Sequence, residues 1–456
     1  MASALEFGAK GNGQADDTQA LQRAIDEGDG VLELGKGSYL ISAPLVLDTT
    51  QRGYVGVRGA QGASRILMTG AGPAFRVIGD HYGTANPASF EDHTWERERF
   101  PVLQGFEVHG RHPEADGIEL LRTVQCTVQN VLIRECRYGI HLVERNRNPI
   151  IANSHIYNCS DSGIFFDAVN LHQAIIIGNH ISYCARAGIR QFNGDVHNIQ
   201  ITGNDIEYNA GYEDGPSGEI VLEVPDDGLI SEYTIASNTL QAKSENNGAN
   251  IIMTGRAIPD DSSIRVVSIT GNVIGDRNKN ILMRYAERAI TISANTMYTG
   301  MEASIDLADC SQIAITGNTI HHSPLSRDFD DVGGVLLEDC KDCILTGNIL
   351  TGLAYGDDTR GGAVTVTRCS GIAVSDCHIV SPLHRGVYLE SSALCRIANN
   401  TILDRRNEPL MKTGIQVTGD SRDNLVQHNQ VQAGSAGAVV CDEGQAVVLN
   451  NTIVAA

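Results

Sequence analysis

The residues that decide the fold form one short phrase, which returns as TGNVI at 270–274, TGNTI at 316–320 and TGNIL at 346–350. Altered copies extend the series in both directions, from VQNVLI around Asn130 to NNTI at Asn451. The thirteen copies span 321 residues in 12 intervals, or about 27 residues per repeat. Self-similarity at such a period is the signature of a solenoid, in which each repeat packs on its neighbours.

A second phrase lies between these copies and begins with Gly-Ile or Gly-Val. It reads GIEL at Gly117, GIHL at Gly139, GIFF at Gly163, GIRQ at Gly188, GVLL at Gly334, GVYL at Gly386 and GIQV at Gly414. Its alternation of apolar and variable residues is typical of a strand with one buried face. The repeats leave no room for a crossover helix and lack the fixed leucine frame of leucine-rich repeats. The sequence therefore predicts an all-β, single-stranded parallel β-helix of about 13 or more coils, with a hydrogen-bonded Asn column at one bend.

Composition limits the classes of partner. The chain has 456 residues, of which 42% are hydrophobic and 20% are charged, so it can bury a large core. Lys and Arg number 34 against 55 Asp and Glu, which gives a formal charge of −21. Binders of nucleic acid or of anionic membranes need a concentrated basic face. No apolar run reaches the ~18 residues that span a bilayer. Neither nucleic acid nor a membrane is therefore an expected partner.

The eleven cysteines follow the repeat. In two runs they recur at intervals close to the coil length: Cys136, Cys159 and Cys184, then Cys310, Cys340 and Cys369. Cysteines in register with a repeat are typical of small buried residues in a stack. The pair Cys340 and Cys343 forms a lone CxxC without a second pair or neighbouring histidines, so we expect no zinc site there. The sequence predicts mostly free, buried thiols.

The open end of a β-helix exposes strand edges and needs a cap. The DDT phrase at 16–18, followed by Leu21 and Ile25, predicts an N-capped amphipathic helix that covers the first coil. We therefore expect a capping segment at residues 1–30 and one β-helix domain at residues 31–456. At the other end we expect a loop or a second subunit to cover the last strand, which leaves a homo-oligomer open.

The opening of the chain, FGAKGNG at 7–13 and DDTQALQRAID at 16–26, resembles the start of proteins of the pectate-lyase superfamily. The resemblance implies a right-handed parallel β-helix that acts on a polysaccharide or oligosaccharide in a groove along the outer face of the coils. The superfamily includes polygalacturonase-like hydrolases, lyases, alginate epimerases and phage tailspikes, so the resemblance does not select one activity. It also implies a secreted or periplasmic protein. Because no signal peptide precedes Phe7, a cytoplasmic protein is the alternative.

Ionisable residues concentrate on four successive Gly-Ile strands. The outward positions after Gly-Ile are Glu119, His141, Phe165 and Arg190, and the flanking positions hold Asp116, Tyr138, Asp161, Arg186 and Asp167. Across residues 250–285 the corresponding outward positions are the apolar Ile252 and Leu282. This unevenness predicts a site at residues 116–192. A solvated, salt-bridged surface is the competing interpretation.

Paired carboxylates favour hydrolysis or glycosyl transfer as the leading interpretation. Asp116 and Asp161 lie two coils apart, ~9–10 Å by strand spacing, near the upper limit for an inverting glycosidase. Glu119 is the alternative acid, and Asp167 is a further carboxylate on this face. The chain lacks the Gly-Asp-Asp phrase of polygalacturonase-like enzymes and has Arg137, Tyr138 and Gly139 in its place. Such an enzyme requires no cofactor.

Two other functions stay open. A lyase or epimerase acting on a uronate polymer needs a base, an acid and a cation beside the carboxylate. Tyr138, His141, Arg186 and Arg190 offer these groups; in the hydrolase interpretation His141 and the two arginines orient the substrate. The third alternative is a glycan-binding protein without catalysis, similar to a tailspike.

Two insertions flank the predicted cleft. Residues 80–100 contain Trp95, which suits stacking on a sugar ring or, alternatively, fills the loop's own small core. Residues 210–218 contain Tyr212 and are expected to form the other wall. Two acidic pairs offer oxygen ligands for calcium, with a solvated acidic loop as the alternative interpretation. They are Asp330 with Asp331 and Asp357 with Asp358.

Overall fold

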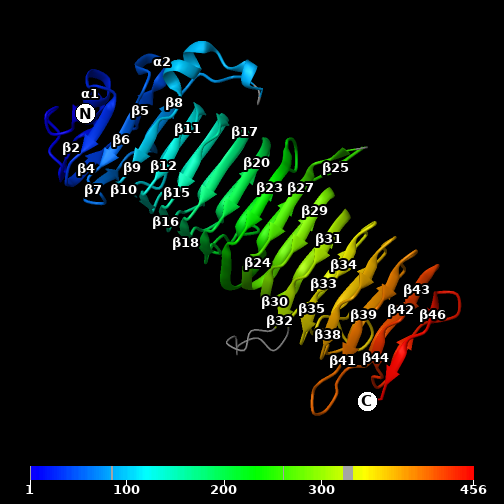
Figure 1. Ribbon diagram of the computed structural model, residues 1–456. Coiled ribbons are helices and arrows are strands. Elements are labelled where there is room, and N and C mark those ends of the chain that lie inside the picture. The colour runs from blue at the N-terminus through cyan, green and yellow to red at the C-terminus, as the bar shows by residue number, and fades with distance from the viewer. Residues whose placement is uncertain (1, 84–85, 260, 322–331, 456) are drawn as a thin grey trace. The chain divides into compact units, whose positions relative to one another are not determined.

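The computed structural model describes residues 2–83, 86–259, 261–321 and 332–455 (Figure 1). It divides into two compact units, Met1–Thr234 (unit 1) and Ile235–Ala456 (unit 2). In both units the chain winds in coils that contribute strands to three parallel rows, here called rows 1, 2 and 3 in the order in which the chain visits them. This confirms the predicted parallel β-helix. The expected single domain over residues 31–456 stays a prediction.

In unit 1, row 1 carries the Gly-Ile phrases. It comprises β5 (Leu45–Asp48), β8 (Gly72–Ile78), β11 (Ala115–Val124), β14 (Tyr138–Arg147), β17 (Ser162–Ile177), β19 (Ala187–Phe192) and β22 (Gly218–Glu223). Row 2 comprises β3 (Val31–Leu34), β6 (Gly56–Gly59), β9 (Val102–Gln104), β12 (Thr127–Gln129), β15 (Ile150–Ala152), the end of β17, β20 (Asp195–Thr202) and β23 (Leu229–Ala236). Row 3 comprises β4 (Gly37–Ile41), β7 (Ser64–Met68), β10 (Glu107–Gly110), β13 (Leu132–Arg134), β16 (His155–Tyr157), β18 (His180–Ser182) and β21 (Asp205–Glu207).

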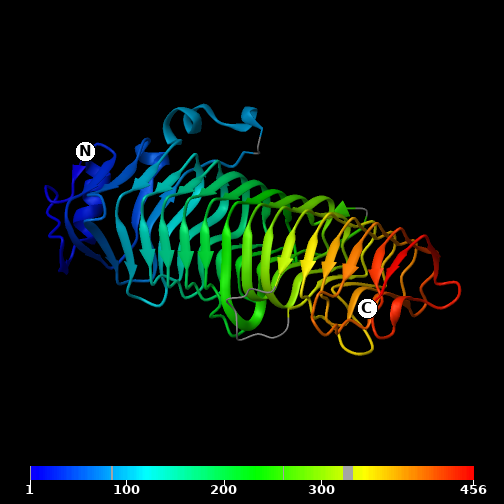
Figure 2. The same cartoon turned by 60° about the horizontal axis from the view of Figure 1, so that its bottom comes forward.

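In unit 2 the same three rows recur (Figure 2). Row 1 comprises β24 (Thr239–Thr254), β28 (Val273–Arg284), β30 (Thr296–Ala308), β33 (Val335–Glu338), β36 (Val364–Thr367), β39 (Arg385–Glu390), β42 (Thr413–Thr418) and β45 (Gly437–Val440). Row 2 comprises β27 (Ile264–Thr270), β29 (Glu287–Ser293), β31 (Ser311–Thr316), β34 (Ile344–Thr346), β37 (Ala373–Ser375), β40 (Arg396–Ala398), β43 (Asn424–Gln427) and β46 (Ala446–Leu449). Row 3 takes the first residues of β24, β28 and β30, then β32 (Thr319–His321), β35 (Ile349–Thr351), β38 (His378–Val380), β41 (Thr401–Leu403), β44 (Gln430–Gln432) and β47 (Thr452–Val454).

The core is built from columns of aliphatic side chains. Successive row 1 strands of unit 1 align Ile118, Ile140, Ile164, Ile189 and Ile220, and all five are completely buried. Burial of each such side chain stabilises the fold by about 1.5–3 kcal/mol. Because side chains alternate along a strand, the residue after each Ile faces outward. The aliphatic columns therefore fix which residues of row 1 can form a site.

A column of asparagines joins the coils at the bend between rows 2 and 3, as predicted. In unit 2 the Nδ2 group of Asn272 donates to Oδ1 of Asn295 at 3.0 Å, and Asn295 donates to Asn318 at 3.0 Å. Asn318 in turn donates to Asn348 at 2.9 Å. Each amide also donates to a backbone carbonyl, as Asn295 does to Ile269. Buried polar groups are costly unless they are hydrogen-bonded, and here the repeat itself supplies the partners.

All eleven cysteines lie among the described residues, and all are free thiols; ten are buried and Cys441 is half-buried. This confirms the prediction from their spacing. Burial raises the pKa of Cys126 to about 12, so its thiol stays protonated at neutral pH.

The predicted N-terminal helix is α1 (Thr18–Glu27), whose buried face packs on β3 and β5. Its cap differs from the expectation. The Asp17 carboxylate accepts hydrogen bonds from the backbone N–H groups of Lys10 and Gly11 rather than from the helix. The other short elements of unit 1 are β1 (Ala2–Ser3), β2 (Asn12–Asp16), α2 (Thr49–Arg52), η1 (Pro87–Ser89) and the π-helical turn η2 (Thr94–Glu98).

Unit 2 adds one antiparallel pair, β25 (Ala257–Ile258) with β26 (Asp261–Ser262). Its last coil exposes Val447, Leu449 and Ile453. The expected covering loop or subunit stays a prediction. None of the described helices is long and apolar enough to cross a membrane.

Candidate functional site

The register of unit 1 brings the predicted outward residues into one column. Glu119 on β11 pairs with His141 on β14, which pairs with Phe165 on β17, and Phe165 pairs with Arg190 on β19. Arg76 on β8 precedes Glu119 in the same column. Parallel strands lie ~4.8 Å apart, so these side chains touch in sequence. We call this set the unit 1 column.

His141 is at the centre of the unit 1 column. Its Nε2 atom lies 3.0 Å from Oδ2 of Asp167, and its Nδ1 atom lies 3.8 Å from Oε2 of Glu119. Glu119 is in turn held by Arg76, with 2.5 Å between Nε and Oε1. The imidazole therefore lies between two carboxylates. This geometry suits proton transfer, although Glu119 is largely committed to Arg76.

Aromatic rings surround the imidazole. Tyr138 lies 4.7 Å from His141 and 5.0 Å from Phe165 between ring centroids, and His141 stacks parallel to Phe165 at 5.4 Å. Burial raises the pKa of the Tyr138 hydroxyl, and the negative charges of Asp161 and Asp167 raise it further against the opposing effect of a neighbouring arginine. Tyr138 is therefore protonated at neutral pH and can donate a proton.

Two arginines complete the unit 1 column. The Arg190 guanidinium lies over the Phe165 ring at 4.6 Å and 3.7 Å from Oδ1 of Asp161. Burial lowers the pKa of Arg190, and the positive charge of Arg186 lowers it further. Arg186 covers the ring of Tyr212 at 4.7 Å. Tyr212 thus lies beside Arg186, and the expectation that the 210–218 loop walls a cleft stays a prediction.

Three buried nitrogen atoms in this region have no hydrogen-bond partner among the residues that the structure describes. They are Nδ1 of His141, Nε of Arg186 and Nε of Arg190. Buried polar groups without a partner are rare and costly, so each one calls for an explanation. These three nitrogen atoms can therefore hydrogen-bond to a ligand in this region.

Asp116 is not available to a substrate. Its side chain is 2% exposed, and Arg137 binds both carboxylate oxygens at 2.9 and 2.7 Å. The backbone N–H of Tyr138 donates to the same carboxylate at 3.3 Å. Asp161 keeps an accessible carboxylate, which accepts a 2.6 Å hydrogen bond from Oγ of Ser162. Asp116 is therefore engaged by Arg137, and of the predicted carboxylate pair only Asp161 stays accessible.

Trp95 lies in η2, above the turns between rows 1 and 2. Its ring makes an edge contact with Phe90 at 5.4 Å and carries Arg99 over its face at 4.6 Å. A cavity of about 300 Å³ forms there. Its lining residues are Phe90, Asp92, Trp95, Gln125, Arg147 and Asn148. None of these residues belongs to the unit 1 column, so Trp95 forms a separate surface.

Unit 2 contains a polar groove that the sequence analysis missed. It encloses about 770 Å³ over β28, β30, β33, β36 and β39. The functional groups in its lining are Lys279, Arg284, Glu302, Asp306, Glu338, Tyr355, Asp357, Arg360, Arg368, Tyr388 and Glu390. Extending the outward-position scan beyond residue 285 would have found Asp306, Glu338 and Glu390 in the phrases SIDL, VLLE and VYLE. We call this cavity the unit 2 groove.

Asp306 is the most confined carboxylate of the unit 2 groove. Its Oδ2 atom lies 2.7 Å from Nζ of Lys279 and 2.9 Å from Nη2 of Arg284. Burial alone would raise its pKa, but the hydrogen bonds from Arg284 and Lys279 outweigh burial and hold the pKa below its usual value. Asp306 therefore stays ionised and can act as a base.

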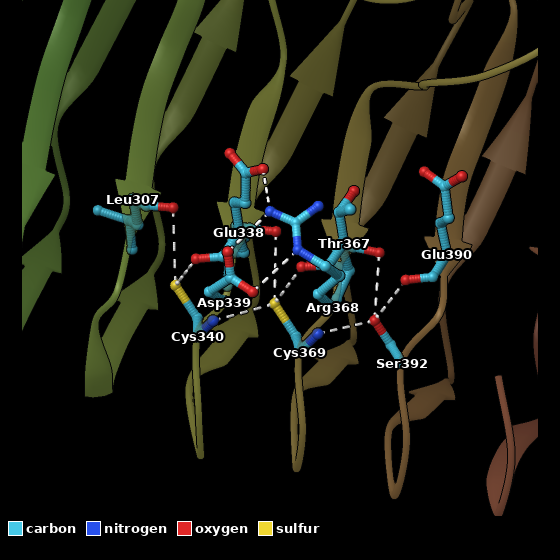
Figure 3. Close-up of polar contacts among 11 residues, drawn as sticks. Leu307, Glu338, Asp339, Cys340, Thr367, Arg368, Cys369, Glu390 and Ser392 are labelled. Atoms are coloured by element: carbon cyan, nitrogen blue, oxygen red, sulfur yellow. Dashed lines mark hydrogen bonds and ion pairs between the residues drawn. The ribbon is translucent and has the colours of Figure 1, made fainter. Parts of the chain in front are cut away.

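A second carboxylate of the groove lies on the next row 1 strand. Glu338 at the end of β33 forms an ion pair with Arg368, which also binds both oxygens of Asp339 at 3.0 and 2.7 Å. Figure 3 shows Glu338 and Glu390 pointing away from the column formed by Cys340 and Cys369. The groove side of these strands is thus acidic, and Arg368 is shared between two carboxylates.

Arg385 shapes the wall of the unit 2 groove. It is 3% exposed and donates from Nη1 to the carbonyls of Asp357 and Gly361 at 2.9 and 3.1 Å. Its Nη2 group donates to the carbonyl of Asp358 at 2.9 Å. These bonds fix the loop that carries Tyr355 into the groove lining.

Asp357 and Asp358, the second acidic pair considered for calcium, both contact other groups of the chain. The Asp357 carboxylate accepts hydrogen bonds from the backbone and hydroxyl of Thr359, which lower its pKa to about 2. Asp358 lies 2.6 Å from Nζ of Lys412. The first pair, Asp330 and Asp331, lies outside the described residues. Calcium binding stays a prediction.

The sequence matches the family described as "Right handed beta helix region" over residues 102–218 and 326–456, more than half of the chain. The chain therefore belongs to this family, and the match supplies the right-handed sense of the coils. No curated protein matches the sequence.

Several solved structures are similar to this chain at low sequence identity. The Dettilon tailspike protein is 16% identical with a TM-score of 0.50, over 98% of this chain and 68% of that one. The A-module of the mannuronan C-5 epimerase AlgE6 from Azotobacter vinelandii is 15% identical with a TM-score of 0.43, over 100% of this chain and 99% of that one. ORF18 of Geobacillus virus E2 is 13% identical with a TM-score of 0.45, and the match covers 75% of this chain and 59% of that one. At this identity the tailspike match shows the fold alone.

Proposed function

We propose that this member of the right-handed β-helix family cleaves glycosidic bonds of a polysaccharide or oligosaccharide in the unit 2 groove. The observation that carries the proposal is a groove of about 770 Å³ in which Asp306 and Glu338 come from adjacent strands. The resemblance of residues 7–26 to the pectate-lyase superfamily supports a glycan substrate. A secreted or periplasmic location fits such a substrate.

The spacing of the two carboxylates suits an inverting mechanism. Asp306 pairs with Leu336, two residues before Glu338. A strand spacing of ~4.8 Å and a rise of ~3.3 Å per residue place the Cα atoms of Asp306 and Glu338 about 8 Å apart. Inverting glycosidases hold their carboxyl groups about 6.5–9.5 Å apart to admit a water molecule. The strand register is therefore compatible with inversion, and the anomeric configuration of the first product decides between inversion and retention.

We assign the roles of base and acid from the ion pairs and the exposure of the two carboxylates. Asp306 is held ionised by Lys279 and Arg284 and is the base that activates water. Glu338 lies on the adjacent strand and its side chain is half-exposed, and we assign it the role of the acid that protonates the leaving group. Tyr355, which is exposed, offers a ring face that suits a sugar ring.

The test is a panel of neutral and uronate-containing polysaccharides, read for new reducing ends and for the ultraviolet absorbance of a conjugated double bond. Hydrolysis gives reducing ends without absorbance. Glu338→Gln is expected to lose about 10²–10⁴-fold in kcat while it unfolds like the parent. Glu408→Gln, an exposed glutamate in a unit 2 loop, is the matched control. Full activity in Glu338→Gln would remove Glu338 from the reaction.

The unit 1 column supports a second candidate, elimination or epimerisation of a uronate. The specific observation is Tyr138 packed on His141, whose Nε2 atom binds Asp167. One side chain can take the proton beside the uronate carboxyl and the other can return one, while Arg190 neutralises the carboxylate. Asp161 and Glu119 orient these groups through Arg190 and His141.

The second candidate function predicts a different product, and a different variant tests it. A lyase gives ultraviolet absorbance together with reducing ends, and an epimerase gives neither but changes the C5 configuration measured by NMR. Tyr138→Phe is expected to abolish either product, and Tyr183→Phe, an exposed row 3 tyrosine, is the control. Glycan binding without any product would instead establish the third alternative, a binding protein similar to a tailspike.

A further inference from the structure

Residues 80–100 leave the coils of unit 1 after β8 and return before β9 (Figures 1 and 2). Three side chains of this segment converge. Nε2 of His93 lies 2.7 Å from Oδ2 of Asp80 and 3.8 Å from Oε1 of Glu98. One ligand atom from each of the three residues lies within 4.8 Å of the other two. None of the three residues belongs to the unit 1 column or to the unit 2 groove.

Glu98 is the unusual member of this cluster, because its side chain is only 5% exposed. It accepts hydrogen bonds from the backbone N–H of Asp80 at 3.2 Å and from Oγ1 of Thr49 at 3.3 Å. Glu98 thus presents a buried carboxylate to a partly exposed carboxylate and imidazole, and a bound cation would offset the two negative charges.

We propose that Asp80, His93 and Glu98 bind a divalent transition-metal cation of the Zn²⁺ class. An imidazole nitrogen with two carboxylate oxygens is a ligand set for zinc, whereas calcium and magnesium prefer oxygen ligands alone. Tetrahedral bonds of about 2.0–2.2 Å separate neighbouring ligand atoms by about 3.4 Å. The observed 2.7 and 3.8 Å bracket that separation. The exposed sides of Asp80 and His93 leave a fourth position to water.

A bound ion would anchor the segment between β8 and β9 to the coils of unit 1. Asp80 lies two residues after the end of β8, whereas His93 precedes η2 and Glu98 is its last residue. Glu98 also accepts a hydrogen bond from Thr49 at the start of α2. A metal bond from each ligand therefore joins the two ends of the 80–100 segment. Fixing η2 in this way positions Trp95, the single tryptophan of the chain.

Because Trp95 lies between two ligands, its fluorescence reports occupancy of this site directly. The protein is first stripped with a chelator and then titrated with ZnCl₂ alone, following both bound metal and tryptophan emission. We expect one equivalent of Zn²⁺ to bind with a change in emission, and Ca²⁺ to leave the emission unchanged. His93→Ala and Glu98→Gln are each expected to weaken this binding about tenfold or more.

The chain offers a matched control in a second cluster of unit 1. His180, Asp205 and Glu207 on row 3 also lie within 4.8 Å of one another but are more exposed. His180→Ala is expected to retain the Zn²⁺-dependent change in Trp95 emission. Should Glu98→Gln fold poorly, His93→Ala decides, because the His93 side chain is half-exposed.

Three outcomes overturn the proposal: no stoichiometric Zn²⁺, unchanged Trp95 emission on binding, or loss of the signal in His180→Ala but not in His93→Ala. A shared proton would then account for the contact between Asp80 and Glu98. The readout is independent of glycan cleavage, so failure of the proposed function leaves this test intact.

Discussion

The unit 1 column and the unit 2 groove each lie on row 1 strands of their own unit, but their charged residues have different partners. In unit 1 Asp116 is enclosed by Arg137, and Glu119 is held by Arg76. In unit 2 Glu338 and Glu390 lie at strand ends, beside a loop that builds a wall. We therefore propose that charge on an outward strand face forms a site where a loop encloses it. Asp116, which lies just before the Gly-Ile phrase, instead forms a structural ion pair with Arg137.

The largest expected effect separates the two regions by activity. Asp306→Asn removes the proposed base and should lower the rate of reducing-end formation by about 10²–10⁴-fold. Asp161→Asn makes the same chemical change in unit 1 and should leave that rate within about threefold. Steady-state kinetics on the best substrate of the polysaccharide panel measure both. If Asp161→Asn lowered the rate more than Asp306→Asn did, the catalytic carboxylate would lie in unit 1 instead.

Stability should separate a buried ion pair from an exposed one. Arg137→Met leaves the Asp116 carboxylate buried without its counter-ion and should cost about 3–5 kcal/mol. Arg368→Met removes a half-exposed arginine from Glu338 and Asp339 and should cost about 1 kcal/mol or less. Urea unfolding midpoints of the two variants give the comparison. Equal losses of unfolding free energy in the two variants would mean that the burial of Asp116 does not increase the cost of removing its counter-ion.

Periodic features of the fold could be predicted, because they depend on the spacing of residues along one chain. The Asn column, the free thiols and the alignment of Glu119 with His141 all follow from the repeat. The ion pair of Asp116 with Arg137 did not follow, because spacing does not say which of two neighbouring side chains reaches back across a coil. The wall of the unit 2 groove depends on Arg385 and backbone carbonyls more than twenty residues away. Such contacts have no signal in local periodicity.

Acid unfolding should distinguish the two regions through Asp306. A carboxyl whose pKa is lower in the folded than in the unfolded protein stabilises the fold above the unfolded pKa, about 3.9 for aspartate. That stabilisation is lost as the pH falls through the folded pKa. Asp306→Asn should therefore flatten the fall in stability below about pH 4 and leave the slope at higher pH unchanged. An unchanged slope below pH 4, measured by urea unfolding at several pH values, would mean that Lys279 and Arg284 do not hold Asp306 ionised.

The smallest expected effect concerns the asparagine columns. In unit 1 the amide of Asn179 donates to Asn204 at 3.0 Å, whereas in unit 2 the column is interrupted where Asn348 meets the thiol of Cys377 at 3.8 Å. Cys377→Asn supplies an amide of similar volume that can accept from Asn348 and donate to the coil beyond. We expect it to raise stability by about 0.5–1.5 kcal/mol, the net value of one hydrogen bond. Cys377→Ala, which removes the thiol without adding an amide, is the control and should lower stability. A loss of stability in Cys377→Asn as well would show that the packing around Cys377, rather than the missing hydrogen bond, decides this position.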